Sequence, residues 1–394
     1  MSVIQHLTSQ PTVQQALQWF HREQNTAVDL AIQIQQIPAP TFAEGVRANF
    51  VQRQFQQLGL GNVTQDELCN VYGRYPSQNP SLPPVIISAH TDTVFPAGTN
   101  LNIRREGNRI YGPGLADNSA GVAGLIVLVQ ALQAHGLRPQ RDIWLVANIA
   151  EEGLGDLKGM RAVVERFGRT GTYLVLEGGS FGHLVHRAIG VNRFRIEVRA
   201  QGGHSWADFG QTSAIHVLGR LITAIADLSV PQNPKTTYNV GKIEGGTSIN
   251  TIAETASFLL DVRSESNQEL ALLVQKMRQI VAVANSVPHQ QVQMNKIGDR
   301  PAGALTADSP LLDWATKALR VVECPRPEYG ASSTDANIPL SLGYEAICIG
   351  LSHSGNVHRL DEYFDTTHFP RGLGQLLLLA LATAGFNEQG IRNN

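Results

Sequence analysis

The sequence predicts an α/β fold with a mostly parallel sheet flanked by helices and a smaller α+β domain inserted into it. The main observation is a series of short apolar runs, at residues 85–89, 143–150, 173–176 and 346–350, that alternate with helical patterns. Apolar strands that alternate with helices are typical of a parallel sheet with both faces covered. The second observation is a change of pattern between residues 187 and 301.

Two further stretches fill in the main domain. Residues 11–58 show apolar positions at helical spacing, with a break at residues 38–41 that contains two prolines. A glycine-rich turn at residues 111–121 runs into an apolar helix at 122–132. Both stretches predict helices that cover the sheet.

Residues 187–301 read as a separate domain. Apolar and charged residues alternate along 191–200, which indicates a strand with one exposed face. The elements expected after it are a helix at 212–228, strands near 237–243 and 253–262, a helix at 267–283 and a strand near 291–296. This order of elements is that of the split βαβ sandwich. We therefore predict a main domain at residues 1–186 and 302–394 and an inserted domain at 187–301.

The length of the chain fits two domains, and its composition argues against binding to nucleic acid or to an acidic membrane. The 394 residues carry a formal net charge of -2, and the scattered Lys and Arg give no footprint for nucleic acid or an acidic membrane surface. Three widely spaced cysteines, Cys69, Cys324 and Cys348, form neither a zinc knuckle nor a disulfide framework, which favours a reducing compartment. No basic-then-apolar leader and no apolar run long enough to span a bilayer are visible. We expect a cytoplasmic protein.

Polar side chains of the kinds that bind metals follow the predicted strands. They are His90 and Asp92, Asp117 in the glycine-rich turn, Glu151 and Glu152, Glu177, and, after the last strand, His353 and His358. In open α/β sheets, ligands bind beyond the carboxyl ends of the strands. A set of histidines and carboxylates without cysteine suits hydrolytic zinc and also tolerates cobalt or manganese. Each residue also has a plainer interpretation, such as a helix cap for Asp117.

Two histidines and three carboxylates suffice for two ions when one carboxylate bridges them. The predicted ligands are His90, Asp117, Glu152, Glu177 and His358. Asp117 is the natural bridge, because a short carboxylate in a glycine turn can face both ions. Asp92 alternates with His90 in an extended chain and can orient its ring. Glu151 diverges from Glu152, so we assign it as the general base.

These residues, in this order, resemble those of the co-catalytic di-zinc exopeptidases and amidohydrolases. The matching motifs are His90-x-Asp92, Gly114-Leu115-Ala116-Asp117, Glu151-Glu152-Gly153, Glu177 and His358. The family includes glutamate carboxypeptidase, peptidase T, aminoacylase and succinyl-diaminopimelate desuccinylase, and the resemblance covers nearly the whole chain. It implies a zinc exopeptidase-like α/β domain with two zinc ions and an inserted ferredoxin-like lid that often forms a homodimer. It also favours His358 over His353, because residues 358–362 are similar to the family's His-x-x-x-Glu segment.

The resemblance extends to the substrate side of the site. Residues 201–205 are similar to the family's Gly-Gly-His-Ser loop, which implies that His204 stabilises the tetrahedral oxyanion, commonly in the partner subunit's site. Asn250 and Arg263 resemble lid residues that contact substrate, and a guanidinium suits a bidentate grip on a carboxylate. Gly330 begins a segment similar to the family's glycine-rich substrate loop. Taken alone, His204 is more typical of a solvated surface residue, and Arg263 of a salt-bridge partner at a strand end.

The sequence therefore predicts a di-zinc metallohydrolase that cleaves the amide bond of short peptides as an exopeptidase. Two alternatives share this chemistry, an N-acyl amino-acid amidohydrolase and a carboxypeptidase, and the sequence does not choose between aminopeptidase and carboxypeptidase action. An alternative of another class is a non-catalytic, zinc-stabilised binding or scaffold protein, which the presence of Glu151, Asp92 and His204 disfavours. A nucleophilic hydrolase is set aside, because the sequence has no Gly-x-Ser-x-Gly elbow.

Overall fold

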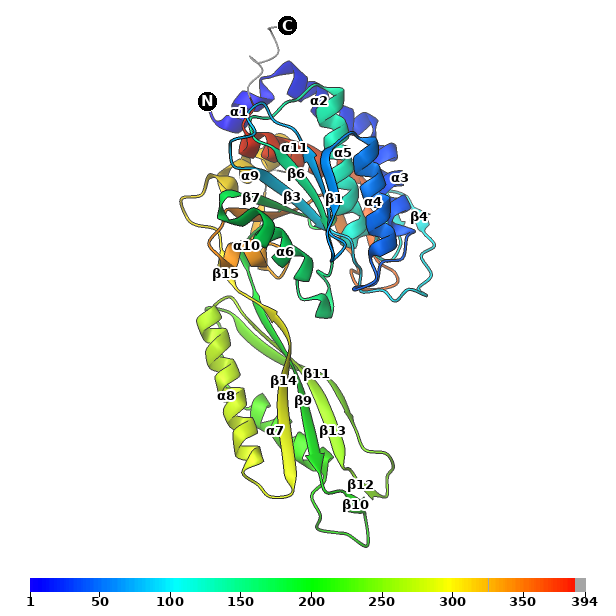
Figure 1. The fold of residues 1–394 in the computed structure, drawn as a ribbon, viewed down its shortest axis with the longest axis vertical. Helices are drawn as coiled ribbons and strands as arrows, with labels where there is room; N and C mark the ends of the chain where they lie inside the picture. Colours follow the sequence, from blue (N-terminus) through cyan, green and yellow to red (C-terminus); the bar gives the residue numbers. More distant parts are fainter. Residues whose placement is uncertain (325, 387–394) are drawn as a thin grey trace. The chain divides into compact units, whose positions relative to one another are not determined.

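A computed structural model describes residues 1–324 and 326–386, and the chain divides into two compact units (Figure 1). The α/β unit comprises Met1–Arg187 and Ala304–Asn394, and the inserted unit comprises Ala188–Gly303. The inserted unit begins one residue later and ends two residues later than the predicted range of 187–301.

A nine-stranded sheet forms the centre of the α/β unit. Its order is β1-β2-β6-β3-β7-β17-β8-β15, and β16 pairs with β8. The four central strands, β6, β3, β7 and β17, run parallel, while β1, β2 and β8 pair antiparallel. The bounds are β1 (Gly61–Gln65), β2 (Val71–Tyr75), β3 (Val85–His90), β6 (Ile143–Asn148), β7 (Thr172–Glu177), β8 (His183–Ala188), β15 (Gly303–Ala304), β16 (Glu328–Ser332) and β17 (Ala346–Gly350). The predicted α/β fold with a parallel core is confirmed, and the antiparallel outer strands are additional.

Helices cover this sheet, and its central strands are accordingly mostly apolar and buried. Every residue of β3 and β17 is buried. Helices α5 and α11 contact β3, α2 and α3 pack against α5, and α6 contacts β6. The bounds are α1 (Val3–Thr8), α2 (Pro11–Arg22), α3 (Gln24–Gln35), α4 (Gly45–Gln57), α5 (Ala120–Ala134), α6 (Lys158–Phe167), α9 (Pro310–Val321), α10 (Asn337–Ser341) and α11 (Phe369–Ala384).

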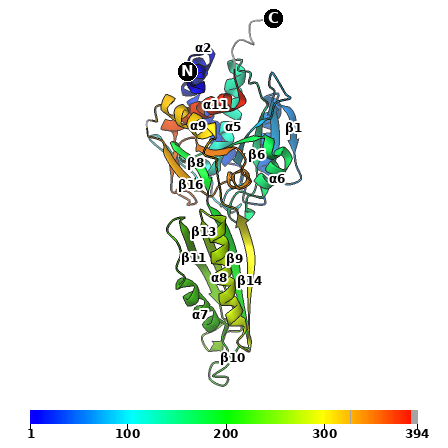
Figure 2. The same cartoon turned by 90° about the vertical axis from the view of Figure 1, so that its left-hand side faces the viewer.

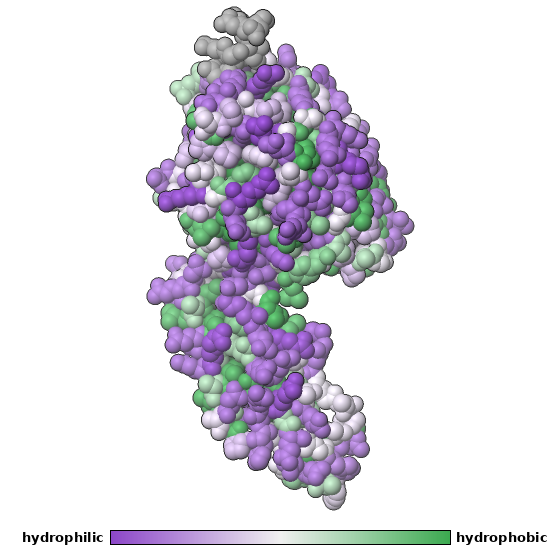
Figure 3. All heavy atoms as spheres, in the orientation of Figure 1, coloured by the Kyte–Doolittle hydropathy of each residue, from purple (hydrophilic) through white to green (hydrophobic). Residues whose placement is uncertain are grey.

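The helices differ in how they meet solvent. Among the described residues, one helical stretch, Leu115–Ala134, is long and apolar enough to cross a membrane, yet 89% of its most apolar window is buried inside the protein. This is the pattern of a central core helix. The outer surfaces of α3 and α4, by contrast, are largely hydrophilic in the view of Figure 3, in keeping with their glutamine-rich sequences.

A second, smaller sheet in the α/β unit was not predicted. Its order is β18-β19-β5-β4, with bounds β4 (Arg104–Glu106), β5 (Arg109–Tyr111), β18 (His353–Gly355) and β19 (Tyr363–Asp365). Strand β19 pairs with β5, and the Gly112 N–H donates to the Glu362 carbonyl at 2.9 Å. The small sheet therefore joins the segment that carries His358 to the start of the turn that carries Asp117.

The inserted unit has the predicted order of elements. A four-stranded antiparallel sheet, ordered β11-β13-β9-β14, carries α7 and α8 on one face (Figures 1 and 2). The core between them is built from inward-facing side chains such as Phe194, Phe258 and Met277. The bounds are β9 (Gly190–Ala200), β10 (Gly203–His204), α7 (Ala214–Ala226), β11 (Thr236–Gly245), β12 (Thr251–Ile252), β13 (Thr255–Ser264), α8 (Asn267–Asn285) and β14 (Gln290–Arg300).

Candidate metal centre

Three neighbouring parallel strands deliver the predicted residues to one edge of the large sheet. His90 is the last residue of β3, and Glu177 is the last residue of β7. Glu151 and Glu152 follow β6, which lies on the other side of β3. Because the strands are parallel, their carboxyl ends meet at the same edge.

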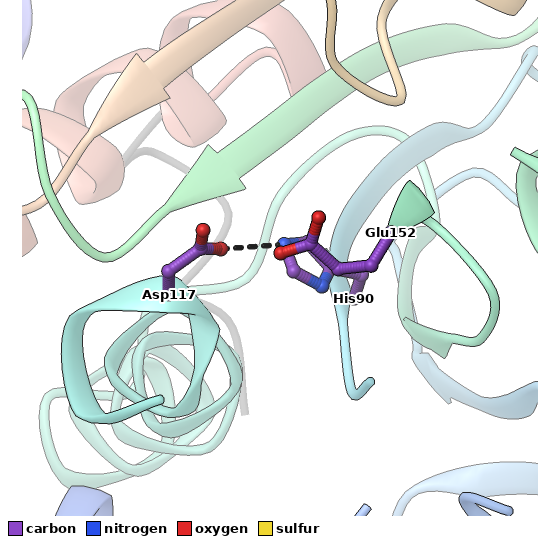
Figure 4. A group of neighbouring side chains, drawn as sticks. All are labelled: His90, Asp117 and Glu152. Carbon is purple, nitrogen blue, oxygen red and sulfur yellow. Dashed lines mark ion pairs between the residues drawn. The ribbon is translucent and has the colours of Figure 1, made fainter. Parts of the chain in front are cut away.

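Asp117 lies between two histidines, His90 and His358, that are far apart in the sequence. Its Oδ1 is 3.0 Å from His90 Nε2, and its Oδ2 is 3.0 Å from His358 Nε2. Figure 4 shows Asp117, from the turn before α5, facing His90 and Glu152. One carboxylate thus offers one oxygen to each of two imidazoles.

Each histidine also faces a second carboxylate. His90 Nε2 lies 3.8 Å from Glu177 Oε2, and His358 Nε2 lies 3.1 Å from Glu152 Oε1. One possible ligand atom from each of His90, Asp117 and Glu152 lies within 4.8 Å of the other two. The structure therefore brings all five predicted ligands together as two groups that share Asp117.

The cluster concentrates negative charge in a buried place. Burial and the charges of Asp117 and Glu151 raise the pKa of Glu152 to about 8. Burial likewise raises the pKa of Glu177 to about 7. A divalent cation neutralises such a group of carboxylates, so this donor set of imidazole and carboxylate groups fits zinc, and also cobalt or manganese.

The same carboxylates also raise the pKa values of the two imidazoles, because nearby negative charges favour the charged ring. Burial disfavours the charged ring of His90, but hydrogen bonds with Asp117 and two other carboxylates outweigh this and hold the pKa of His90 well above its usual range. Hydrogen bonds to Asp117 and Glu152 raise the pKa of His358 to about 10. Burial works against the Asp117 carboxylate, but the same histidine contacts keep the pKa of Asp117 well below its usual range.

Asp92 contacts both the first histidine and the segment that carries the two glutamates. His90 Nδ1 is 3.1 Å from the Asp92 carbonyl oxygen and 3.5 Å from its Oδ1, so Nε2 faces the cluster. The Asp92 carboxylate also accepts the backbone N–H groups of Glu151 and Glu152, each at 2.9 Å. The Thr41 hydroxyl donates to it at 2.9 Å. The contacts to the backbone were not foreseen from the sequence.

Residues around Asp117 hold its turn in place. Asn118 Nδ2 donates to the Leu176 carbonyl, and Asn118 Oδ1 accepts the Gly178 N–H, both at 2.8 Å. A Cβ on Gly178 would lie 2.2 Å from the Ala116 carbonyl oxygen, so only glycine lets the turn approach β7 this closely. The peptide bond between Asp117 and Asn118 is cis.

Glu362 fixes the same turn from the other side. It is fully buried, and its Oε1 accepts the backbone N–H groups of Ala116 at 2.9 Å and Asp117 at 3.2 Å. Burial, with the nearby charge of Asp117, raises the pKa of Glu362 to about 7. Its place in the motif at residues 358–362 did not indicate this contact.

Asp335, in the segment that begins with Gly330, is a second buried acid near the cluster. Its Oδ2 accepts a hydrogen bond from Asn148 at 2.7 Å, at the end of β6. Burial and the charge of Glu151 raise the pKa of Asp335 well above its usual range. Gly330, in the same segment, lies on β16, where the space around its Cα is open.

The other predicted substrate residues belong to the inserted unit. His204, on β10, is exposed, and its Nδ1 accepts the N–H groups of Trp206 and Ala207. The Ser205 N–H donates to the Asn250 carbonyl at 3.0 Å, so the two predicted loops lie together.

Arg263 is already paired within its own strand. Its Nε lies 2.6 Å from Asp261 Oδ1, and Arg193 Nε lies 3.2 Å from Asp261 Oδ2. Two guanidinium groups therefore share one carboxylate.

His353, the alternative to His358, begins β18. Its ring packs edge-on against His368, with centroids 4.4 Å apart, and against Phe181. His358, rather than His353, is the histidine that contacts Asp117.

Most of the sequence matches a known family. The sequence pattern of peptidase family M20/M25/M40 matches residues 86–382, about three quarters of the chain. The chain belongs to this family. The resemblance drawn from the motifs is thereby confirmed, and the protein is placed among peptidases and amidohydrolases.

The individual relatives share little sequence identity with this chain. A peptidase M20 domain-containing protein of Schizosaccharomyces pombe is 27% identical over 67% of this chain, a match that spans 62% of that relative. Carboxypeptidase G2 of Pseudomonas sp. (strain RS-16) is 23% identical over 84% of this chain and 82% of its own. The structure of a tripeptidase from Staphylococcus aureus has a TM-score of 0.78 at 19% identity, covering 91% of this chain and 98% of that one. At this identity the structural similarity shows the fold alone.

Replacing His358 tests whether the cluster binds two ions. We expect His358→Ala to lose one of two divalent ions per chain, because this imidazole faces Asp117 and Glu152, while His353→Ala keeps both. Metal analysis after dialysis against zinc measures this. His353 is a matched control, since it is an exposed histidine only five residues away. Loss of metal from His353→Ala alone would reverse the assignment.

Proposed function

We propose that the protein is a di-zinc metallohydrolase that cleaves the amide bond of short peptides as an exopeptidase. The observation that supports it most is the shared carboxylate of Asp117, whose two oxygens each lie 3.0 Å from a different imidazole. His90, Asp117 and Glu177 would hold one ion. Asp117, Glu152 and His358 would hold the other, with cobalt or manganese as alternatives to zinc. Two such ions supply Lewis acidity, which acidifies a water molecule and polarises the amide carbonyl.

Glu151 is the proposed general base. It is buried beside the cluster, and its negative charge contributes to the raised pKa values of Glu152, Glu177 and Asp335. Its backbone N–H is held by Asp92, whereas Glu152 faces His358. In this role Glu151 takes a proton from the attacking water and gives it to the leaving amine.

The inserted unit would complete the site. We assign His204 to the oxyanion, and Asn250, Arg263 and Gly330 to substrate contacts. The side chain of Arg263 is 44% exposed, and its guanidinium is the group that we propose to contact a substrate carboxylate. This feature favours a carboxypeptidase or an N-acyl amino-acid amidohydrolase as the second candidate, since both substrates carry a free carboxylate.

Exposed apolar side chains lie close in sequence to the site residues. Leu154 and Leu360 each follow a predicted ligand by two residues and are 59% and 70% exposed, and Phe42, next to Thr41, is 63% exposed. Hydrophobic atoms are visible at the end of the α/β unit that lies below α4 in Figure 3. We propose that the accepted residue or acyl group is apolar.

Two further proposals concern the oligomeric state and a non-enzymatic alternative. We propose a homodimer formed through the inserted unit, in which His204 of one subunit acts in the site of its partner. A non-catalytic, zinc-stabilised scaffold is the alternative of another class, and a panel of substrates separates it from an enzyme. A cytoplasmic location stays a prediction.

Hydrolysis of a small substrate panel tests the proposed function. The panel contains di- and tripeptides with apolar or acidic side chains, each also with a blocked amino or a blocked carboxyl end. It also contains N-acetyl amino acids with apolar or acidic side chains, each also as the C-terminal amide. We expect the zinc-loaded protein to cleave apolar members at least about tenfold faster in kcat/KM than acidic ones. Cleavage that survives an N-terminal block but not a C-terminal amide assigns carboxypeptidase or amidohydrolase action. Two bound ions with no cleavage of any member would favour the scaffold.

Removing the proposed base tests the mechanism. We expect Glu151→Gln to lower kcat by about 10²–10⁴-fold, because proton transfer is lost while the ligands remain. Metal content should stay at the wild-type value, and Glu152→Gln is the matched control that should lose metal as well. Loss of metal from Glu151→Gln would contradict the assignment.

Mixing two inactive variants tests the role of His204. We expect His204→Ala to lower kcat by about 10²–10³-fold with the metal retained. After subunit exchange with Glu151→Gln protein, roughly a quarter of wild-type activity should return, since half of the dimers are mixed and each has one intact site. No recovery after verified exchange would show that His204 serves its own subunit.

A further inference from the structure

Three consecutive backbone N–H groups around the proposed base are held by two buried carboxylates. The N–H groups of Glu151 and Glu152 donate to the two oxygens of Asp92. The N–H of Ala150, one residue earlier, donates to Oε1 of Glu44 at 3.1 Å. Glu44 is only 4% exposed and lies 106 positions away in the sequence, so this contact is a long-range tertiary one.

The side chain of Glu44 does not cap α4, although Glu44 occupies the N-cap position of that helix. A side chain at this position usually accepts an N–H of the helix's first turn, yet that of Glu44 makes no such hydrogen bond. Instead, Oε1 accepts the N–H groups of Phe42 at 3.0 Å and Ala150 at 3.1 Å. One carboxylate oxygen thus ties the loop before α4 to the segment that carries the base.

Both residues held by this oxygen have an unfavourable backbone conformation. Phe42 has a φ of 73° and Ala150 a φ of 53°, in the left-handed region that residues with a Cβ seldom occupy. Such conformations persist only where the surrounding structure holds them, and they gather at functional sites. Ala150 directly precedes Glu151, so its φ and ψ set the direction in which the Glu151 side chain leaves the backbone.

The geometry points to Glu44 as a positioning residue for the catalytic base: by holding Ala150 in the left-handed conformation, it aims the carboxylate of Glu151. This inference rests on the proposed function for the identity of the base, but not for the geometry. Asp92 continues to hold Glu151 and Glu152 when Glu44 is changed, so the ligand Glu152 stays in place. Loss of Glu44 therefore acts on turnover and not on metal binding.

The kinetic test uses three substitutions of Glu44 on whichever panel substrate is cleaved. We expect Glu44→Ala to lower kcat by about 10–100-fold, because small misplacements of a reacting group cost this much. Its KM and its metal content should remain near the wild-type values. Glu44→Gln keeps an oxygen that can accept both N–H groups and should retain nearly full kcat. Glu44→Asp keeps the charge but is shorter, and should fall between them.

Asp142→Ala is the matched control for the loss of a buried carboxylate. Asp142 is 7% exposed in the same unit, accepts the Ser77 N–H at 2.9 Å and pairs with Arg74. We expect it to lower Tm about as much as Glu44→Ala while leaving kcat unchanged. Equal losses of kcat in Glu44→Ala and Asp142→Ala, or a Gln variant as slow as the Ala variant, would overturn the inference.

Crystal structures of the Glu44→Gln and Glu44→Asp variants test the positioning role independently of enzymatic activity. We expect Ala150 to keep a positive φ in the Gln variant and to leave the left-handed region in the Asp variant, with the Glu151 carboxylate displaced and the Glu152–His358 contact unchanged. Ala150 at positive φ in both variants would refute the positioning role. If the wild-type protein cleaves no panel member but these structures differ as expected, the proposed function fails and the positioning of residue 151 by Glu44 stands.

Discussion

The site depends on the interactions of one carboxylate, that of Asp117, with the imidazoles of His90 and His358. These interactions join the end of a central strand to a segment near the end of the chain, and the two glutamates that complete the groups come from two other strands. Gathering several carboxylates in a buried place is unfavourable unless opposite charges or hydrogen bonds compensate for it. The two imidazoles supply part of this compensation, and Asn118 and Glu362 hold the turn that places Asp117 between them.

Much of the centre could be predicted from sequence because it lies where parallel strands end. A strand buried on both faces appears as an uninterrupted apolar run, so the first polar residue after each run marks the carboxyl edge of the sheet. Glu177 follows this rule directly, and His90 follows a mostly apolar run that contains Ser88. Asp117 required the further clue of a glycine-rich turn. The element order of the inserted unit was likewise visible, because its strands have one exposed face and its helices are amphipathic.

The residues that hold the centre in position could not be found in this way. Glu362 and Glu44 act on backbone N–H groups that are distant in sequence, and nothing in their own neighbourhoods indicates it. A buried glutamate at the start of a helix resembles any capping residue until the chain is folded. The small sheet of β18, β19, β5 and β4 was missed for a related reason, since strands of three residues are too short to show a periodicity.

The order of the strands has a consequence for synthesis of the protein. Strand β17 lies between β7 and β8, but it is made only after the whole inserted unit has left the ribosome. The inserted unit is continuous in sequence and can complete its own sheet first, whereas the α/β unit must wait with the hydrogen-bonding edge of the apolar strand β7 unpaired. An exposed edge of this kind is where nascent chains associate with one another. Between the translation of β7 and that of β17, this edge is therefore open to pairing with another chain.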